Sequence, residues 1–247
     1  MRTRQKCSSA PFSHCSRADS ALVLSCSFLA LFSNLLGPQP RDHPNIVRYL
    51  GHEVAQDQAS AYIFMEYCSG GDLRSVLRSF GGVAQAVASN YTRQVVEGLG
   101  YLHDHDVLHR DIKGANVLLF ASGVCKLGDF GLARAVASIV PPGGPGKSVA
   151  GTPFWMAPEV IQGRGTSRNS DIWSLGATVF EMGEGKPPFS ELEPTAALFY
   201  IGSVGLLSQP VPEGLGADGK DFVTVCMSKD PVLRPSCREL LQHPFLS

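Results

Sequence analysis

A carboxylate, an ammonium group and a side-chain amide lie within six residues of one another near the middle of the chain. Asp111, Lys113 and Asn116 belong to the stretch HRDIKGAN, which begins at His109. Groups of these types can accept a proton, neutralise an anionic oxygen and bind a hard cation. Each of them alone is usually a solvated surface group, so the argument depends on what accompanies them and what positions them.

Two segments before this loop have the composition of strands in one small sheet. Asn45–Gly51 and Ser60–Tyr67 are rich in Ile, Val, Tyr and Phe, and Gly, Pro and Asp residues bound them. After Gly70-Gly71, apolar residues at helical spacing predict a helix over 73–80 that carries Asp72 at its start. A longer helix is expected next, with one apolar stripe formed by Val87, Tyr91, Val95, Leu99 and Leu102.

The loop leads directly into a predicted hairpin. Val117–Phe120 and Val124–Leu127 are joined through Ala121-Ser122-Gly123, which is typical of two short strands and a turn. From about Met156 onward the pattern is helical, with links rich in Pro and Gly. The sequence therefore predicts an α+β protein in which a small β part precedes a larger α part.

Composition excludes several classes of protein. The net charge of −1 argues against a dedicated nucleic-acid binder, which usually carries a clear basic excess. The seven cysteines contain no Cys-x-x-Cys pair, so neither a disulfide framework nor a thiolate zinc site is indicated. His103-Asp104-His105 lacks a third metal ligand at suitable spacing. We interpret these histidines as the polar end of a helix.

Residues 1–41 differ in character from the rest. An uncharged run extends from Ala21 to Gly37 and superficially resembles a signal peptide. Asp19 lies directly before it, Asn34 interrupts it, and 17 residues fall short of a bilayer span of about 20. A helix packed on the domain, or a stretch from an imperfect gene model, is favoured over secretion or anchoring. We expect no membrane association and a cytoplasmic location.

Three motifs follow one another in a fixed order. Asp129-Phe130-Gly131 begins eighteen residues after Asp111, and Ala157-Pro158-Glu159 ends thirty residues after Asp129. Together with Asp171-Ile172-Trp173-Ser174 and the late Arg234-Pro235, this arrangement closely resembles the protein kinase family. The resemblance implies a two-lobed kinase fold with an incomplete small β lobe and a complete helical lobe. It assigns 42–247 to the kinase domain, with 42–68 as the remnant of the N-lobe and hinge and 69–247 as the C-lobe.

The resemblance also implies roles in ATP-dependent phosphoryl transfer. Asp111 would accept the hydroxyl proton, and Lys113 would reach the γ-phosphate. Asn116 and Asp129 would hold two Mg²⁺ ions. His109 would pack and hydrogen-bond the loop without touching the substrate.

The nucleotide base would lie at the end of the second strand. The stretch Phe64-Met65-Glu66-Tyr67-Cys68 resembles the hinge between kinase lobes, with Met65 as gatekeeper and the backbones of Glu66 and Cys68 as adenine ligands. Asp72 would meet the ribose hydroxyls, and Leu118 would form the pocket floor. A helix N-cap for Asp72 and plain core packing for Leu118 remain equally open.

Further residues indicate substrate class and regulation. Lys113 and Gly151-Thr152-Pro153 resemble serine/threonine rather than tyrosine kinases, with Thr152 near the substrate. Ser148 is the best activation-site candidate, ahead of Ser138, and Arg110 would pair with its phosphate. Glu159 and Arg234 resemble a buried structural ion pair. Stretches such as HPNIVRYLG, GTPFWMAPEVI and ELLQHPFL resemble the mitogen-activated protein kinase kinase kinase branch, which implies a protein substrate such as a mitogen-activated protein kinase kinase.

The N-terminal part departs from the family. A Gly-rich loop, a strand lysine and a helix glutamate should precede His43, yet the first glycine is Gly37, Lys6 is the only lysine before Lys113, and Glu53 is the first glutamate. A serine/threonine kinase and a weak or inactive kinase-like binding module are therefore both open. A small-molecule phosphotransferase would share the Asp-Asn-Asp set but would not need Thr152 or Trp155.

Overall fold

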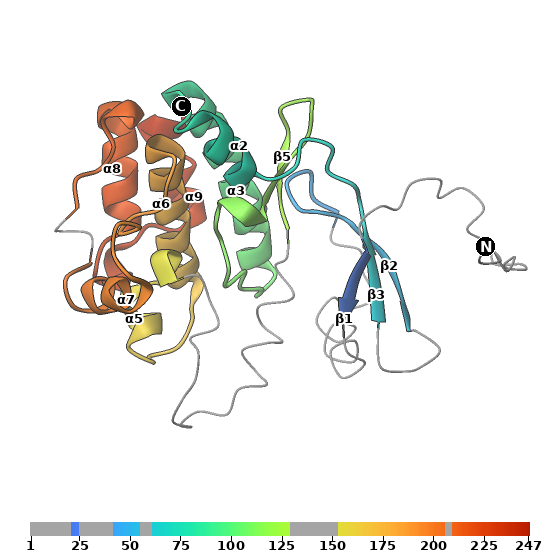
Figure 1. Cartoon of the computed structure of the whole chain (residues 1–247), viewed down its shortest axis with the longest axis horizontal. Helices are drawn as coiled ribbons and strands as arrows, with labels where there is room; N and C mark the ends of the chain where they lie inside the picture. The colour runs from blue at the N-terminus through green and yellow to red at the C-terminus, as the bar shows by residue number, and fades with distance from the viewer. Residues whose placement is uncertain (1–20, 25–41, 55–60, 129–152, 206–208) are drawn as a thin grey trace, which may run out of the picture.

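The computed structural model describes residues 21–24, 42–54, 61–128, 153–205 and 209–247. A helical part and a small three-stranded sheet lie side by side, and the chain after β3 connects them (Figure 1). The expected α+β architecture, with a small β part and a larger helical part, is confirmed.

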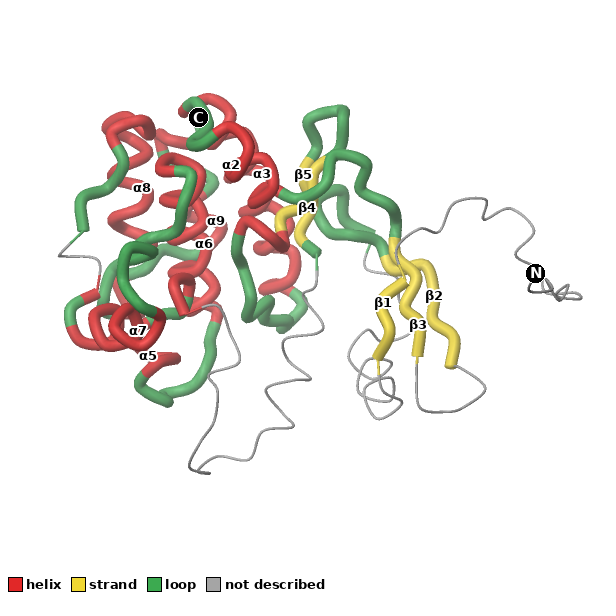
Figure 2. Tube along the Cα trace, in the orientation of Figure 1, coloured by secondary structure: helices red, strands yellow, loops and turns green. Residues whose placement is uncertain are grey.

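The sheet contains β1 (Ala21–Leu24), β2 (Tyr49–Val54) and β3 (Ala61–Met65) in the order β1-β3-β2, and both pairings are antiparallel (Figure 2). The first predicted strand was placed wrongly, because β2 begins at Tyr49 and runs to Val54. The preceding residues pair elsewhere: Val47 donates to Leu127 O at 2.9 Å, and Leu127 donates to Asn45 O at 2.9 Å. A contact far away in sequence therefore takes these residues from the sheet.

A helix packed on the domain was one of the two favoured interpretations of the apolar run, and for the four residues described the helix is wrong. Residues 21–24 form β1, in which Ala21 pairs with Phe64 and Leu24 with Ala61. The physical reason is that β3 would otherwise expose an unpaired row of backbone groups, and a neighbouring strand satisfies them. The other residues of the run lie outside the described part of the chain.

Helix α2 (Leu73–Phe80) has the predicted bounds. Leu73 and Leu77 are buried on its inner face. Its N-terminal backbone is capped by Asp72, and the helix ends at Gly81, whose φ of 80° lies in the left-handed region that favours glycine.

Helix α3 (Gln85–Asp104) also matches the prediction, although its stripe is shorter. Val95, Leu99 and Leu102 are buried, whereas Val87 is 40% exposed. A Cβ atom at Gly98 would lie 2.6 Å from the carbonyl oxygen of Asn45. This close approach requires a glycine and fixes the segment before β2 against the helix.

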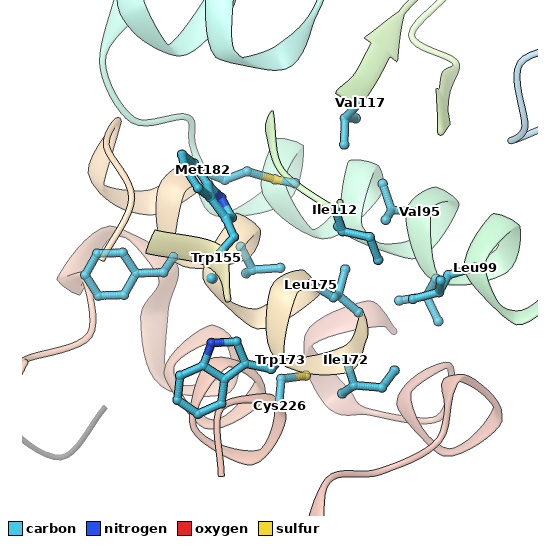
Figure 3. Packing of buried hydrophobic residues seen from close by; sticks show 14 of the residues in the cluster. Val95, Leu99, Ile112, Val117, Trp155, Ile172, Trp173, Leu175, Met182 and Cys226 are labelled. Carbon is cyan, nitrogen blue, oxygen red and sulfur yellow. The ribbon is translucent and has the colours of Figure 1, made fainter. Parts of the chain in front are cut away.

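Helix α6 (Arg168–Glu184) forms the centre of the helical part and is buried on nearly all sides. Trp173 and Phe180 are among its fully buried side chains. Ile172, Leu175 and Met182 of the same helix face the core shared with α3 (Figure 3). The remaining elements are β4 (Val117–Leu119), β5 (Cys125–Leu127), η2 (Pro153–Trp155), α5 (Pro158–Ile161), α7 (Pro194–Ser203), η4 (Glu213–Leu215), α8 (Gly216–Cys226), η5 (Pro231–Leu233), α9 (Cys237–Leu240) and η6 (Pro244–Leu246).

Candidate active site

The loop 109–116 lies between α3 and the β4-β5 hairpin, and its middle is anchored in the core. Ile112 is fully buried and lies near Val95, Leu99 and Leu175 (Figure 3). The polar residues on either side of Ile112 therefore start from a fixed backbone. The loop closes with η1 (Gly114–Asn116), a single 3₁₀ turn.

A buried carboxylate from α6 holds the start of this loop. Asp171 is 1% exposed and accepts from His109 N at 2.9 Å and from Arg110 N at 2.8 Å. Arg110 has a φ of 70°, a conformation that is strained for a residue with a side chain. The two hydrogen bonds to Asp171 hold the backbone in this conformation and offset its cost. Sequence reasoning noted Asp171 only as part of a family motif and missed this role.

Asp111, Lys113 and Asn116 meet around one carboxylate oxygen. Asp111 Oδ2 accepts from Lys113 Nζ at 2.6 Å and from Asn116 Nδ2 at 2.9 Å. Asn116 Nδ2 also donates to the backbone oxygen of Asp111 at 2.7 Å. The Asp111 side chain is 32% exposed and that of Lys113 is 19% exposed. The predicted groups are thus assembled at the surface of the loop, with the carboxylate held by two donors and accessible to a reacting group.

Two histidines support the loop from inside. His109 is fully buried, and its Nδ1 accepts from Asp111 N at 3.3 Å. Burial lowers the pKa of the His109 imidazole, although the carboxylates of Asp171 and Asp111 act in the opposite direction. His103 and His105 lie at the end of α3, as expected, but His103 is not directed at solvent. His103 is 6% exposed, and its Nε2 lies 2.9 Å from Asp171 Oδ2, because the end of α3 faces α6.

A second buried carboxylate joins the loop to the segment that contains Ala157-Pro158-Glu159. Glu181 Oε2 accepts from Gly114 N at 3.0 Å and from Trp155 Nε1 at 3.1 Å. Burial raises the pKa of Glu181, and these two hydrogen bonds oppose the shift. A Cβ at Gly114 would lie 2.9 Å from this carboxylate. Sequence reasoning did not find Glu181, because nothing near it in sequence indicates its partners.

The predicted hinge follows β3 and runs toward α2 (Figure 1). Met65 is the last residue of β3. The Glu66 side chain is engaged with Lys126 and the backbone of Arg48. Cys68 is half-buried, and the pKa of its thiol is raised to about 11 by burial and, to a lesser degree, by the Glu66 carboxylate. Its side chain is therefore a neutral thiol at neutral pH, and the predicted adenine contacts concern the backbone alone.

Asp72 and Leu118 lie together where the hinge meets the hairpin, joined by an isolated antiparallel bridge. Asp72 Oδ1 accepts from Ser75 N at 2.9 Å, and Asp72 Oδ2 accepts from Ser75 Oγ at 2.8 Å. The N-cap role is therefore observed. Leu118 is half-buried between two buried neighbours, which places it on the opposite face of β4 from the core. A place beneath the nucleotide base therefore stays a prediction for Leu118.

Asp129, Ser138, Ser148 and Thr152 lie outside the described residues, so their roles stay predictions. The residue before Asp129 is described: Gly128 N donates to Asn116 O at 2.8 Å. The backbone of Asn116 is therefore bonded to the residue that precedes Asp129 in the sequence.

The predicted ion pair between Glu159 and Arg234 is present. The two guanidinium nitrogens donate to the two carboxylate oxygens at 2.6 and 2.8 Å. Both residues are buried, and the Arg234 guanidinium lies 5.0 Å from the ring centroid of Trp173. This bidentate pair ties α5 to the C-terminal helices.

The comparisons with known proteins agree with this geometry. A family model of the protein kinase domain matches residues 37–246. The chain belongs to the protein kinase family. It is 47% identical over 205 residues to mitogen-activated protein kinase kinase kinase ANP1 of Arabidopsis thaliana, covering 83% of this chain and 30% of that protein. It is 46% identical over 207 residues to human mitogen-activated protein kinase kinase kinase 19, covering 83% of this chain and 15% of that protein.

Another relative carries a different name. Cytokinesis protein sepH of Emericella nidulans is 47% identical over 205 residues, covering 83% of this chain and 15% of that protein. The chain thus spans 15% to 30% of the length of these three relatives. The likeness to the mitogen-activated protein kinase kinase kinase type is confirmed, and the two-lobed kinase fold with an incomplete small lobe agrees with the two small sheets.

The described part of the small lobe carries few cationic side chains. Within residues 21–24, 42–54 and 61–65, Arg48 is the single lysine or arginine. Of the two strands beside β3, β1 has the sequence Ala-Leu-Val-Leu and carries no charged side chain. No described helix is both long and apolar enough to cross a membrane, and the described residues contain no cluster of three or more His, Cys, Asp or Glu side chains arranged for a metal ion.

Proposed function

We propose that this chain is the core of a serine/threonine protein kinase that transfers the γ-phosphate of ATP to protein substrates. Residues 42–68 would be the remnant of its N-lobe and hinge, 69–247 its C-lobe, and 1–41 an atypical segment. The observation that supports the proposal best is the cluster of Asp111, Lys113 and Asn116 on a loop anchored by buried Asp171. A binding module has no need of such a cluster.

The chemistry follows from the position of each group. In phosphoryl transfer the protein mainly positions the acceptor and neutralises charge, because the transition state is loose. Asp111, partly exposed and held by two donors, orients the acceptor hydroxyl and takes its proton at Oδ2 or Oδ1. Lys113, already 2.6 Å from this carboxylate, supplies positive charge at the same point. Thr152 would complete the site on the substrate side.

The residues present suit Mg²⁺. Asn116 directs its amide nitrogen at Asp111, so its amide oxygen takes no part in those two bonds, and oxygen is the ligand that Mg²⁺ prefers. Asn116 and Asp129 would hold the metal, which would neutralise charge on the phosphate oxygens when bound. Adenine would meet the backbones of Glu66 and Cys68, Leu118 would lie beneath it, and Asp72 would reach the ribose.

The similarity to mitogen-activated protein kinase kinase kinases supports a role in such a cascade, with a mitogen-activated protein kinase kinase as the substrate. Phosphorylated Ser148, with Arg110 as its partner, would order the segment around it. A cytoplasmic location is part of this proposal.

A catalytically weak kinase-like module is the second candidate, and the absent lysine favours it. Loss of one preorganised cation on the transferring phosphate costs about 3–4 kcal/mol, or a factor of about 10²–10³ in rate. The chain as written is therefore expected to transfer phosphate very poorly. A chimera with a standard Gly-rich loop, strand lysine and helix glutamate before Asp42 is expected to be active.

The test is γ-phosphate transfer to a protein substrate by both forms, each with an Asp111→Asn control. Turnover of about 1 s⁻¹ by the unmodified chain, lost in its control, would show that another group replaces the lysine. An inactive chimera that is folded would favour the binding module.

A further inference from the structure

A single carboxylate oxygen joins three separate parts of the chain at the boundary between the sheet and the helical part. Glu66 Oε1 accepts from Arg48 N at 2.7 Å and from Lys126 Nζ at 2.7 Å. Glu66 N in turn donates to Arg48 O at 3.0 Å. Glu66 is the first residue after β3, Arg48 is the last before β2, and Lys126 is the middle residue of β5.

The ion pair is largely removed from water. The side chain of Lys126 is 16% exposed and that of Glu66 is 17% exposed. The Lys126 ammonium also lies 5.2 Å from the centroid of the Phe120 ring, a second favourable contact for the cation. Since solvent screening is weaker here, this pair constrains its surroundings more than an exposed pair such as Lys186 with Glu191.

Two chain segments next to the sheet, one leading into β2 and one leading from β3 into the helical part, are fastened to the β4-β5 hairpin. The first segment, at Asn45–Val47, exchanges two backbone hydrogen bonds with Leu127. The second is fastened at the far end of the hinge, where Gly70 N donates to Leu119 O at 2.9 Å and Leu119 N donates to Gly71 O at 2.8 Å. Between these fixed points, Arg48 and Glu66 form a hydrogen-bonded pair directly beside the first pair of the sheet, Tyr49 with Met65.

We infer that Glu66 and Lys126, with the Arg48 backbone, form an interlobe latch that fixes the direction in which the hinge backbone faces the nucleotide. Without the Lys126 ammonium, the hydrogen-bonded pair of Arg48 and Glu66 can rotate against the hairpin while both fixed points remain. The carbonyl of Glu66 and the N–H of Cys68 would then lose their fixed direction. Lys126 is thus a positioning residue for the adenine site, and this inference rests on the proposed function.

The test uses Lys126→Met, which keeps the length of the side chain and removes its charge. Two quantities are measured on the full chain: amide hydrogen exchange at Arg48 and Glu66, and the Kd for Mg·ATP and for adenosine by calorimetry. Adenosine lacks phosphates, so its binding reports the hinge without the missing strand lysine. We expect exchange about tenfold faster and both Kd values about fivefold to tenfold higher, in line with the loss of one partly buried charge pair.

Matched variants separate positioning from general destabilisation. Lys126→Arg keeps the charge, so its exchange rates and Kd values should stay within about twofold of those of the unmodified chain. Lys186→Met removes an exposed lysine from an ion pair elsewhere and should change neither. Glu66→Gln leaves an oxygen for Arg48 N, and the Glu66→Gln, Lys126→Met double variant should behave as Lys126→Met alone, because the two side chains act on the same contact.

Unchanged exchange or unchanged Kd in Lys126→Met would overturn the latch. Equal effects in Lys186→Met would also overturn it, since they would not depend on the hinge. An unmodified chain that binds neither Mg·ATP nor adenosine would instead refute the proposed function, while the exchange comparison would still decide whether Lys126 holds the hinge.

Discussion

Replacing Asp171 tests how the active-site loop is held. In Asp171→Ala, the backbone N–H groups of His109 and Arg110 and the Nε2 of His103 lose their shared acceptor, which they now meet at 2.8–2.9 Å. A buried donor left unsatisfied costs about 1–3 kcal/mol, and breaking a buried charged cluster typically costs about 3–5 kcal/mol in total. We expect a loss of about 3–5 kcal/mol in the free energy of unfolding.

The isosteric variant should lose less. In Asp171→Asn, the amide oxygen still accepts from one backbone N–H, but the amide nitrogen faces another donor. A loss of about 1–3 kcal/mol follows from one unsatisfied group. Asp221→Ala is the matched control, because Asp221 also pairs with a histidine but its side chain is 68% exposed. That change should cost less than about 1 kcal/mol.

The assay is urea unfolding of the full chain with amide exchange measured in parallel. The midpoint should fall in the order Asp221→Ala, Asp171→Asn, Asp171→Ala at nearly constant slope. Exchange at His109 and Arg110 should accelerate in both Asp171 variants. If Asp171→Ala unfolds at the same midpoint as Asp221→Ala, or the two amides keep their protection, the carboxylate does not hold this loop.

Four further outcomes are expected. Asp129→Asn should abolish Mg²⁺-dependent affinity for ATP in calorimetry, and equal Mg·ATP binding by the two forms would contradict the metal assignment. Mass spectrometry of protein from stimulated cells should find phosphate on Ser148; phosphate only outside 132–152 would count against that site. Arg234→Met should lower the free energy of unfolding by about 3–5 kcal/mol, since Glu159 would stay buried and unpaired, and adding Glu159→Gln should recover part of the loss in urea titrations. Burial raises the folded-state pKa of Glu181 above its unfolded value. The free energy of unfolding should therefore fall as pH rises from about 4.3 through the folded pKa. Glu181→Gln should remove this slope from urea midpoints measured against pH, and an unchanged slope would show that Glu181 is not its cause.

Features set by neighbouring residues could be predicted. The helix at Leu73–Phe80 was found because apolar spacing, an acidic cap and a terminal glycine all act within one or two turns. The meeting of Asp111, Lys113 and Asn116 could be expected because six residues of one loop hold them. The pair of Glu159 and Arg234 is distant in sequence, and only its resemblance to a family motif indicated it.

Tertiary contacts changed the predicted start of the sheet. The residues at Asn45–Val47 are composed like a strand, yet they bond to β5, because strand composition specifies an extended backbone but no particular neighbour. Residues 21–24 likewise became a strand because the edge of β3 was available. Apolar runs of this length suit either state, and the available partner decides between them.

The sequence by itself determined the order of the elements from β3 onward, the kinase motifs and the residue types of the chemical site. Only the tertiary structure decided that His103 is buried against Asp171, that Glu181 joins Gly114 to Trp155, and that Glu66 pairs with Lys126. The reason is that a charged residue is expected to be exposed to solvent when only its neighbours in the sequence are known. Its partner, its burial and its effect on a distant backbone depend on which elements pack together, and that packing is a property of the whole chain.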